Sequence, residues 1–482
     1  MGREIHMLLF PFFAHGHAIP TVDMAKLFAS RGVKTTIVTT PVNASFFSNT
    51  IQRSKDSGIH IDVQLLKFPA AEVGLPEGFE SVDMLPTSPD ENFGMMMKFL
   101  QAVQLLQEPF EELLQECKPD CLVADLFFPW ATDAANKLGI PRLVFHGTSY
   151  FSLCVTECMR LYEPHKNVQS DSEPFLVPNL PGDIELTRSQ LPDSMKQDAE
   201  THFTKIVKAA KEAELKSHGV VVNSFYELEA NYADYYRNVL GKKAWHVGPV
   251  SLCNRATIDK AERGKKSAID EHECLKWLDS KQPNSVLYIC FGSMACFTSA
   301  QLKEIAMGLE ASELQFIWVV RKQKNDNEDE EWLPEGFEKR TEGKGLIIRG
   351  WAPQVLILDH EAVGGFVTHC GWNSTLEGVC AGVPMVTWPT FAEQFYNEKL
   401  VTRVLKIGVE VGARKWVRLV GDFVKREAIE KAVTELMKGD EADEMRNRAK
   451  ALAEAAKKAI EKGGSSHSDL HALIEEISLR SH

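Results

Sequence analysis

The sequence predicts an α/β protein built from two Rossmann-like, doubly wound parallel-sheet halves that face each other across a cleft. Short apolar stretches with strand character alternate with helical stretches along almost all of its 482 residues. Continuous apolar strands separated by helices are typical of parallel sheets covered by helices on both faces. A charged, apolar-poor stretch at residues 253–273 interrupts this alternation, and a new strand begins near residue 285. This interruption indicates a linker between two domains.

The expected strands form two groups, one on each side of that linker. In the first half they are residues 5–12, 34–40, 121–127, 141–147 and 219–225. In the second half they are residues 285–292, 315–321, 344–350, 364–369 and 384–389. Helix starts are marked as well, for example by the capping box Thr298-Ser-Ala-Gln301. We therefore expect an N-terminal domain over residues 1–250, a linker over 251–275 and a C-terminal domain over 276–464.

Composition and charge exclude several classes of function and location. The net charge of -13 argues against a nucleic-acid partner, which would require an excess of Lys and Arg. No window approaches the about 18 uninterrupted apolar residues of a membrane helix, and the N-terminal apolar run is too short for a signal peptide. The ten cysteines include no CxxC pair, so we expect core thiols. These observations together favour the cytoplasm.

The polar stretch HCGWNSTLEG, residues 369–378, is the most informative part of the chain. It follows an expected strand and opens an expected helix, and ligands of parallel sheets bind beyond the carboxyl ends of the strands. A helix N-terminus attracts anions, and His369, Asn373 and Ser374 add donors there. Glu377, one turn later, could accept hydrogen bonds from sugar hydroxyls. The stretch predicts a site for a phosphate attached to a hydroxyl-rich group, and an N-cap with ordinary polar neighbours is the alternative.

Other phosphate-binding motifs are missing from the sequence. It contains no GxGxxG, which removes the main support for a dinucleotide dehydrogenase, and no GxxxxGK[ST] P-loop. It also contains no DxD, the usual carboxylate pair for a metal-bridged diphosphate. We therefore expect a diphosphate that is neutralised by a helix dipole and side chains, with no metal and no cofactor.

Residues 351–394, WAPQVLILDHEAVGGFVTHCGWNSTLEGVCAGVPMVTWPTFAEQ, resemble the signature box of plant secondary-metabolite UDP-glycosyltransferases, an inverting family with the GT-B fold. The N-terminal FPFFAHGHAIP, the FGSM turn and the chain length also fit, so the resemblance covers essentially the whole chain. It implies a metal-independent UDP-glucose O-glucosyltransferase, usually a monomer, that acts on a small lipophilic acceptor. It further implies that the C-terminal helix, residues 465–482, packs back on the N-terminal domain.

The resemblance also assigns donor-binding roles to individual residues. The indole of Trp351 would stack on uracil, and the backbone of Ala352 would read the edge of that base. The other contacts it implies are Gln354 and Glu377 to the ribose, His369, Asn373, Ser374 and Ser293 to the diphosphate, and Trp372, Glu393 and Gln394 around the sugar. A final Gln is typical of glucose users in the family, whereas galactose users tend to carry His. Thr390 stands where the family more often has an apolar residue.

A hydroxyl acceptor needs a general base within hydrogen-bond reach. The stretch FFAHGHAIP offers His15 and His17 at the end of the first strand, and a capping or core role stays open for a histidine there. Asp125 ends a buried strand, where an unpaired carboxylate would be costly; it could orient the base or cap a helix. The resemblance assigns the base to His17 and its partner to Asp125, and gives His15 no catalytic role.

Bulky apolar residues near strand ends of the N-terminal half indicate an acceptor pocket. We expect Phe13, Phe128 and Thr148 to line it. The family resemblance favours a flavonoid or another phenolic as acceptor, with triterpenoid or steroid alcohols as the alternative. A UDP-sugar epimerase and a non-catalytic nucleotide-sugar binding protein are alternatives of a different class, and neither requires the pair His17 and Asp125.

Overall fold

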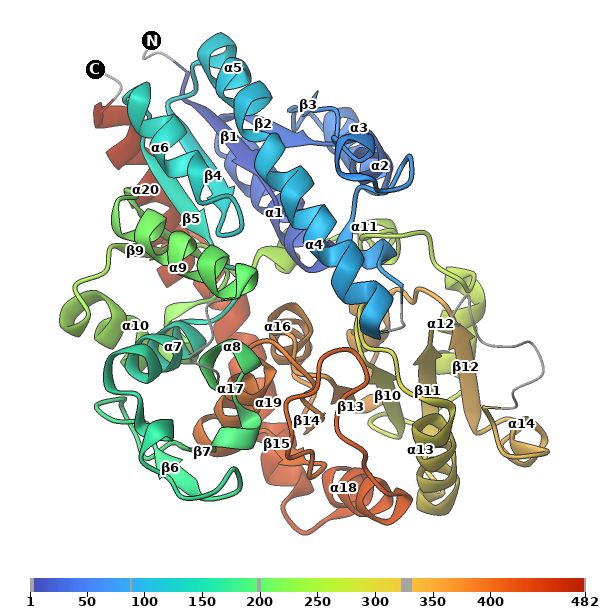
Figure 1. Cartoon of the computed structure of the whole chain (residues 1–482). Helices are drawn as coiled ribbons and strands as arrows, with labels where there is room; N and C mark the ends of the chain where they lie inside the picture. Colours follow the sequence, from blue (N-terminus) through green and yellow to red (C-terminus); the bar gives the residue numbers. More distant parts are fainter. Residues whose placement is uncertain (1–3, 87–88, 197–200, 322–331, 481–482) are drawn as a thin grey trace.

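Two parallel β-sheets, one in each half of the chain, form the framework of the molecule (Figure 1). The computed structural model describes residues 4–86, 89–196, 201–321 and 332–480. The first sheet has the strand order β3-β2-β1-β4-β5-β8-β9, and the second has the order β12-β11-β10-β13-β14-β15. Helices cover both faces of each sheet, so the predicted class of two doubly wound α/β domains is confirmed.

The N-terminal sheet pairs its seven strands in parallel throughout. Its strands are β1 His6–Phe10, β2 Lys34–Thr39, β3 Ile61–Leu65, β4 Cys121–Asp125, β5 Arg142–Phe145, β8 Gly219–Val222 and β9 Ala244–His246. A separate antiparallel hairpin joins β6 Pro174–Leu176 to β7 Glu185–Thr187. The helices of this half are α1 His15–Ala29, α2 Pro41–Ser45, α3 Ser48–Asp56, α4 Pro89–Leu105, α5 Gln107–Cys117, α6 Trp130–Lys137, α7 Tyr150–Tyr162, α8 Asp193–Lys196, α9 His202–Leu215 and α10 Tyr226–Asp234.

The C-terminal sheet is also parallel. Its strands are β10 Val286–Cys290, β11 Gln315–Val320, β12 Gly345–Arg349, β13 Val363–Thr368, β14 Met385–Thr387 and β15 Gly408–Glu410. Its helices are α12 Glu271–Asp279, α13 Ser299–Ser312, α14 Phe337–Arg340, α15 Gln354–Leu358, α16 Trp372–Ala381, α17 Gln394–Lys399, α18 Arg426–Lys438 and α19 Ala442–Ile460. The predicted capping box is confirmed at its N-cap residue, because the Thr298 hydroxyl accepts a hydrogen bond from the Gln301 backbone amide.

All ten strands that the sequence predicts are present, whereas β3, β9, β15 and the hairpin strands β6 and β7 were not predicted. β6, β7, β9 and β15 contain only three residues each, and the outer strand β3 has only five residues and is mostly exposed beyond Ile61. Such strands give little periodic signal. The stretch predicted as a linker carries the short helix α11 Thr257–Ala261 and the start of α12.

Each sheet has one topological switch point, the position at which the strand order reverses. In the first sheet β1 lies beside β4, with Phe10 opposite Ala124. In the second sheet β10 lies beside β13, with Cys290 opposite Thr368. The chain leaves the two strands of each pair towards opposite sides, which opens a crevice beyond their carboxyl ends. The segments that follow β1, β4, β10 and β13 carry most of the predicted site residues.

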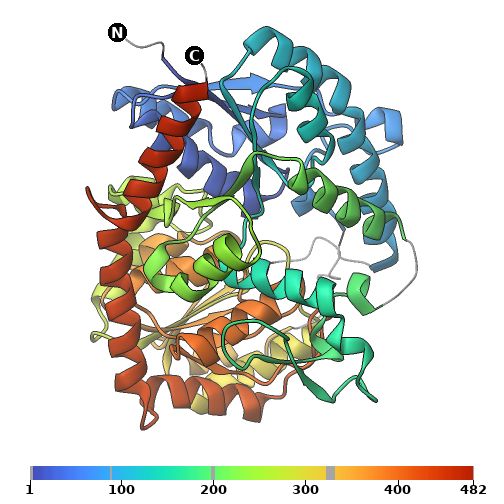
Figure 2. The same cartoon turned by 90° about the vertical axis from the view of Figure 1, so that its left-hand side faces the viewer.

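The last helix, α20 Ser465–Arg480, lies against the N-terminal domain (Figure 2). Its apolar residues Leu470, Leu473 and Ile477 are at most 3% exposed. They join a core cluster with β1, α1 and β9 residues such as Met7, Phe28 and Trp245. The chain therefore ends by contributing to the core of the domain in which it began.

Candidate functional site

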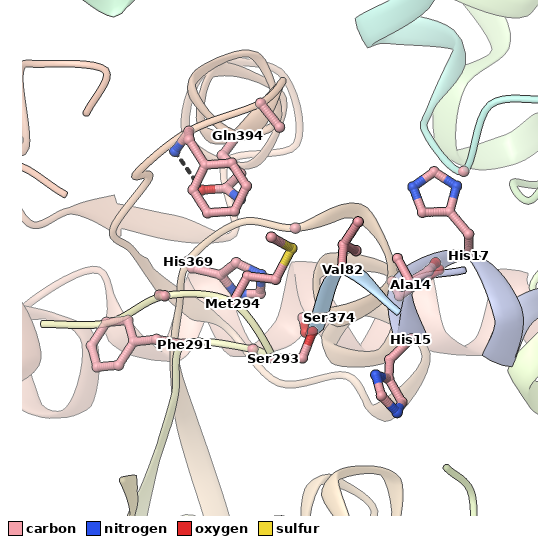
Figure 3. Close-up of a pocket in the computed structure, with 18 of the residues that line it drawn as sticks. Ala14, His15, His17, Val82, Phe291, Ser293, Met294, His369, Ser374 and Gln394 are labelled. Carbon is pink, nitrogen blue, oxygen red and sulfur yellow. Dashed lines mark hydrogen bonds between the residues drawn. The ribbon is translucent and has the colours of Figure 1, made fainter. Parts of the chain in front are cut away.

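The two switch points open into one cleft of about 1300 Å³ between the domains. Residues from both halves line it, and Figure 3 shows a set of them. Ala14, His17 and Val82 approach from the N-terminal domain, whereas Ser293 and His369 belong to the C-terminal domain. The volume exceeds that of an ordinary single-ligand pocket, which is about 300–1,000 Å³, so the cleft has room for two small molecules.

His17 and Asp125 form a hydrogen-bonded pair at the carboxyl ends of β1 and β4. The His17 Nδ1 atom lies 2.6 Å from Asp125 Oδ2. The other carboxylate oxygen accepts the Phe127 amide at 3.1 Å, and the Asp125 carbonyl accepts Arg142 Nη2 at 2.7 Å. Because the carboxylate holds Nδ1, the Nε2 atom of His17 is the one left for a substrate proton.

The environment of His17 suits a base. Burial lowers the pKa of His17, but the charges of Asp125, Glu393 and Asp83 outweigh it and leave this pKa above 6.5. The side chain is 22% exposed, whereas that of Asp125 is fully buried. A left-handed Gly147 lies beside the imidazole, and a Cβ there would stand 3.5 Å from the ring. The base can therefore be reached from the cleft while its partner cannot.

Opposite this pair, α16 points its N-terminus into the cleft. No side chain caps this end of the helix, so its first amides are available to an anion. His369 lies against it, held by two glycines: a Cβ on Gly292 or Gly371 would stand 2.5 Å from the imidazole ring. Burial lowers the pKa of His369 to about 4, so this side chain is neutral at pH 7. Its Nδ1 atom is buried and has no hydrogen-bond partner among the residues that the structure describes.

Gln354, Ser374 and Glu377 form a connected polar group at one end of the cleft. The Gln354 amide donates to Ser374 Oγ at 3.0 Å and to Glu377 Oε2 at 2.7 Å. Trp351, two residues after the end of β12, lines the same cleft. Its carbonyl accepts the Ala268 amide at 2.8 Å. An aromatic face beside a carboxylate and an amide suits a base attached to a sugar with vicinal hydroxyls.

Gln394 and Glu393 lie at the sugar end of the predicted donor site. The side-chain oxygen of Gln394 accepts the Thr390 and Phe391 amides and the Thr390 hydroxyl, at 2.9, 3.0 and 2.8 Å. Its NH₂ group is therefore the part left to donate to a ligand. Burial raises the pKa of Glu393, although the neighbouring His17 and Thr148 oppose this shift.

Trp372 and Asn373 use their side chains to join the domains. The Trp372 indole donates to the Asn223 carbonyl at 2.7 Å, and the Asn373 amide donates to the Gly16 carbonyl at 2.6 Å. Both residues line the cleft, but the side-chain donors predicted for sugar and diphosphate are engaged in this structure. The backbone amides at the start of α16 remain.

The apolar wall of the cleft differs from the one that the sequence predicts. Phe13 and Phe128 are 1% and 0% exposed, and they lie in the core of the N-terminal domain away from the cleft. The prediction that they line an acceptor pocket is therefore wrong. Thr148 stands next to Glu393 and is not part of the wall either. The apolar side chains that line the cleft from the N-terminal half include Phe12, Val82, Met96, Met97, Leu100 and Phe127.

The prediction fails at positions 13 and 128 because the side chains of adjacent residues at a strand end or in a turn point to opposite sides. Phe12 and Phe127, one residue before each, pack against one another with ring centroids 4.5 Å apart and ring planes tilted by 35°. They lie 5.7 and 5.9 Å from the ring of His17. The acceptor wall thus surrounds the base.

Two features of the site were not predicted. His15 pairs with Asp83, whose carboxylate also accepts the His15 backbone amide at 2.8 Å. Arg263, from the predicted linker, pairs with both Asp23 and Glu377. Arg263 lines the cleft, whereas Asp83 contacts the lining residue His15. Neither lies in a motif, so only the folded chain brings them there.

The described ranges lack two kinds of feature. No helix there is both long and apolar enough to cross a membrane. Nor do these residues hold a group of three or more His, Cys, Asp and Glu side chains arranged to bind a metal ion.

Comparison with known proteins gives matches along the whole chain. The family model described as UDP-glucoronosyl and UDP-glucosyl transferase matches residues 91–441. Scopoletin glucosyltransferase of Nicotiana tabacum is 61% identical over 475 residues, which cover 98% of each chain. Anthocyanin 3'-O-beta-glucosyltransferase of Gentiana triflora is 58% identical over 484 residues, or 99% of each chain.

Solved structures also match this chain over almost its whole length. The crystal structure of Glycyrrhiza uralensis UGT73P12 with glycyrrhetinic acid 3-O-monoglucuronide superposes with a TM-score of 0.91 at 45% identity, covering 99% of this chain and 96% of that chain. Arabidopsis thaliana UGT89C1 with UDP-L-rhamnose gives a TM-score of 0.75 at 29% identity, covering 99% and 100%. The predicted GT-B fold is thereby confirmed.

Proposed function

Because the chain belongs to the UDP-glucoronosyl and UDP-glucosyl transferase family and is a UDP-glycosyltransferase, we propose that it moves glucose from UDP-glucose to a hydroxyl of a small phenolic, with inversion of the anomeric carbon. One observation carries this proposal. The pair of His17 and Asp125 faces the open N-terminus of α16 across a single cleft, with an apolar wall around the imidazole. A base, an anion site and an apolar surface are what such a transfer needs.

In the proposed reaction, Nε2 of His17 removes the proton of the acceptor hydroxyl as its oxygen attacks the anomeric carbon. The bond from that carbon to the UDP oxygen breaks, and the electron pair leaves with UDP. Asp125 stabilises the imidazolium that forms, without taking its proton. A single displacement from the face opposite UDP turns an α-linked donor into a β-glucoside. General-base assistance of this kind typically contributes about 10²–10⁴-fold in rate.

The departing UDP gains its negative charge at the start of α16. The dipole of that helix and its free amides stabilise an anion by about 0.3–1 kcal/mol, and by up to about 2 kcal/mol when partly buried. Ser293, Ser374 and the neutral His369 supply further hydrogen-bond donors. We therefore propose that transfer does not require a metal ion. The roles of Trp351 and Ala352 at the uracil, of Gln354 and Glu377 at the ribose, and of Glu393 and Gln394 at the sugar are part of the same proposal.

The proposed acceptor class is supported by the names of the relatives and by the apolar wall of the cleft. Relatives at 57–61% identity are named for scopoletin, anthocyanin and flavonoid acceptors. Flat aromatic acceptors suit a wall of Phe12, Phe127 and two methionines. The neighbour crystallised with glycyrrhetinic acid 3-O-monoglucuronide supports polycyclic triterpenoid alcohols as the second candidate. A cytoplasmic location is also a proposal: all ten cysteines are free thiols, which suits a reducing compartment.

The test is an incubation of the purified protein with UDP-glucose and a panel of scopoletin, a flavonol, an anthocyanidin and a triterpenoid alcohol. It is run with and without EDTA, and products are identified by mass spectrometry and by the NMR coupling of the anomeric proton. We expect a β-glucoside of a phenolic in both conditions. Glucosylation of the triterpenoid alone would support the second candidate. Release of an altered UDP-sugar without acceptor would indicate an epimerase, and loss of activity with EDTA would contradict metal independence.

A further inference from the structure

The segment between the two domains passes over the nucleoside end of the cleft. Gly264, with φ +96°, lies between the domains: a Cβ on it would stand 2.6 Å from the Trp351 ring and 2.9 Å from Ile19 of α1. Four residues later, the Ala268 amide donates to the Trp351 carbonyl at 2.8 Å. This segment therefore contacts the indole that we propose as the uracil platform.

Arg263 precedes that glycine and joins three parts of the chain. Its Nε atom lies 2.7 Å from Asp23 Oδ2 on α1, and its Nη1 atom pairs with Glu377 Oε1 on α16. The Arg263 side chain is 10% exposed, and the two carboxylates are 2% and 6% exposed. Burial alone would lower the pKa of Arg263, but Asp23 and Glu377 raise it, so the guanidinium keeps its charge.

Each of the two carboxylates that Arg263 contacts also accepts a hydrogen bond from a side-chain amide. Glu377 Oε2 accepts the Gln354 amide at 2.7 Å, and Asp23 Oδ1 accepts the amide of Asn254 at 2.8 Å. Each oxygen of a carboxylate has two lone pairs. One contact per oxygen leaves Glu377 able to accept two more hydrogen bonds, in an orientation fixed by Arg263 and Gln354.

Without Arg263, Glu377 would be a buried carboxylate next to the place proposed for a negatively charged diphosphate. An unpaired buried charge is costly, and a second anion nearby raises that cost. A planar guanidinium can also hold two carboxylates in fixed directions, which a lysine ammonium cannot.

We propose that Arg263 is a positioning residue for the donor ribose: it holds the Glu377 carboxylate towards the vicinal ribose hydroxyls and, through Asp23, fixes this carboxylate relative to α1, the helix that carries His17. The inference rests on the proposed role of Glu377. It assigns to the inter-domain segment a part in donor recognition, beyond connecting the domains.

The test is the discrimination between UDP and 2′-deoxy-UDP, measured by calorimetry on the full chain. We expect the wild type to prefer UDP. Arg263→Met is expected to weaken UDP binding by about 10- to 100-fold, the range for losing a hydrogen bond to a charged group, and to weaken 2′-deoxy-UDP binding less. The preference for UDP should therefore shrink, and Arg263→Lys should restore part of it. At saturating UDP-glucose, Arg263→Met should also lower kcat, since α1 loses its tie to α16.

Arg53→Met is the matched control. Arg53 also ties the N-terminal domain to the inter-domain segment, through Asp259 at 3.1 Å and through Glu262, but it does not contact Glu377. This variant should retain the wild-type preference. If Arg263→Met and Arg263→Lys both keep the full preference while Glu377→Gln loses it, the role of Arg263 is refuted and that of Glu377 stands. If the wild type itself binds both nucleotides equally, the ribose role of Glu377 fails and the inference falls with it.

Discussion

The first turn of α1 carries two histidines, two residues apart, that each pair with an aspartate but lie in different surroundings. His17 pairs with Asp125 through Nδ1, and His15 pairs with Asp83 through the same atom. The His17 side chain is 22% exposed, whereas that of His15 is 4% exposed. Figure 3 shows the two imidazoles pointing in opposite directions from Ala14.

Their surroundings explain what each pair can do. Asp83 also accepts the His15 backbone amide and the Ser81 hydroxyl, so this pair fixes the start of α1. Asp125 is fixed by the Phe127 amide and leaves His17 free on its cleft side. A histidine–aspartate pair therefore indicates a base only where the second nitrogen can reach a substrate.

The largest effect that separates the two pairs is expected from His17→Ala. Transfer to a neutral alcohol should fall by about 10²–10⁴-fold, because the proton of the attacking hydroxyl loses its acceptor. UDP binding, measured by calorimetry, should stay within a few-fold of the wild type since the donor contacts lie across the cleft. Unchanged turnover would exclude His17 as the base.

Asp125→Asn should have the next largest effect. The asparagine can keep the contact with the Phe127 amide, but its NH₂ group would face Nδ1 and favour the wrong tautomer of His17. We expect about a 10²-fold loss with neutral alcohols, and a smaller loss with acidic phenols that are partly ionised unaided. Initial rates with both acceptor types measure this difference. Equal losses would remove the proposed stabilisation of the imidazolium.

His15→Gln should change turnover by less than tenfold. The amide can still donate to Asp83 and so preserve the start of α1, and no proton transfer passes through this side chain. Kinetics with the acceptors used for His17→Ala provide the comparison, and thermal unfolding shows whether the helix start is retained. A loss as large as that of His17→Ala would place the base at His15 instead.

Thr390→Val is expected to have the smallest effect, about two- to fivefold in kcat/KM. It removes one of the three hydrogen bonds that fix the Gln394 oxygen, and a net hydrogen bond is worth about 0.5–1.5 kcal/mol. Thr341→Val, which removes a hydroxyl contact to the Phe337 carbonyl away from the cleft, serves as the control. Equal kcat/KM values for the two variants would show that Thr390 does not position Gln394.

The sequence predicts the framework of this molecule well because its strands are apolar and separated by helices. It misses β3, β6, β7, β9 and β15, since a mostly exposed five-residue strand and three-residue strands carry little pattern. The extents of the domains, 1–250 and 276–464 with the linker 251–275, stay predictions.

The site is predictable only where residues share a motif. His17 and the 351–394 box are identified by their neighbours in sequence. Arg263 reaches the cleft, and Asp83 reaches the lining residue His15, through folding alone. Phe13 and Phe128 were assigned to the wrong face because a turn decides which of two adjacent aromatics faces the cleft. Sequence pattern shows the existence of a strand better than it shows the direction of the side chains beyond its end.

The most direct test of the difference between the pairs is the pH profile of kcat/KM for a neutral alcohol, in the wild type and in His15→Gln. Burial lowers the pKa of His17, yet Asp125, Glu393 and Asp83 together raise it above 6.5. Since only the neutral imidazole accepts a proton, activity should fall as the pH drops through this raised pKa. We predict an acid limb with an apparent pKa above 6.5 in both proteins. An acid limb that disappears in His15→Gln would contradict the assignment of the base to His17.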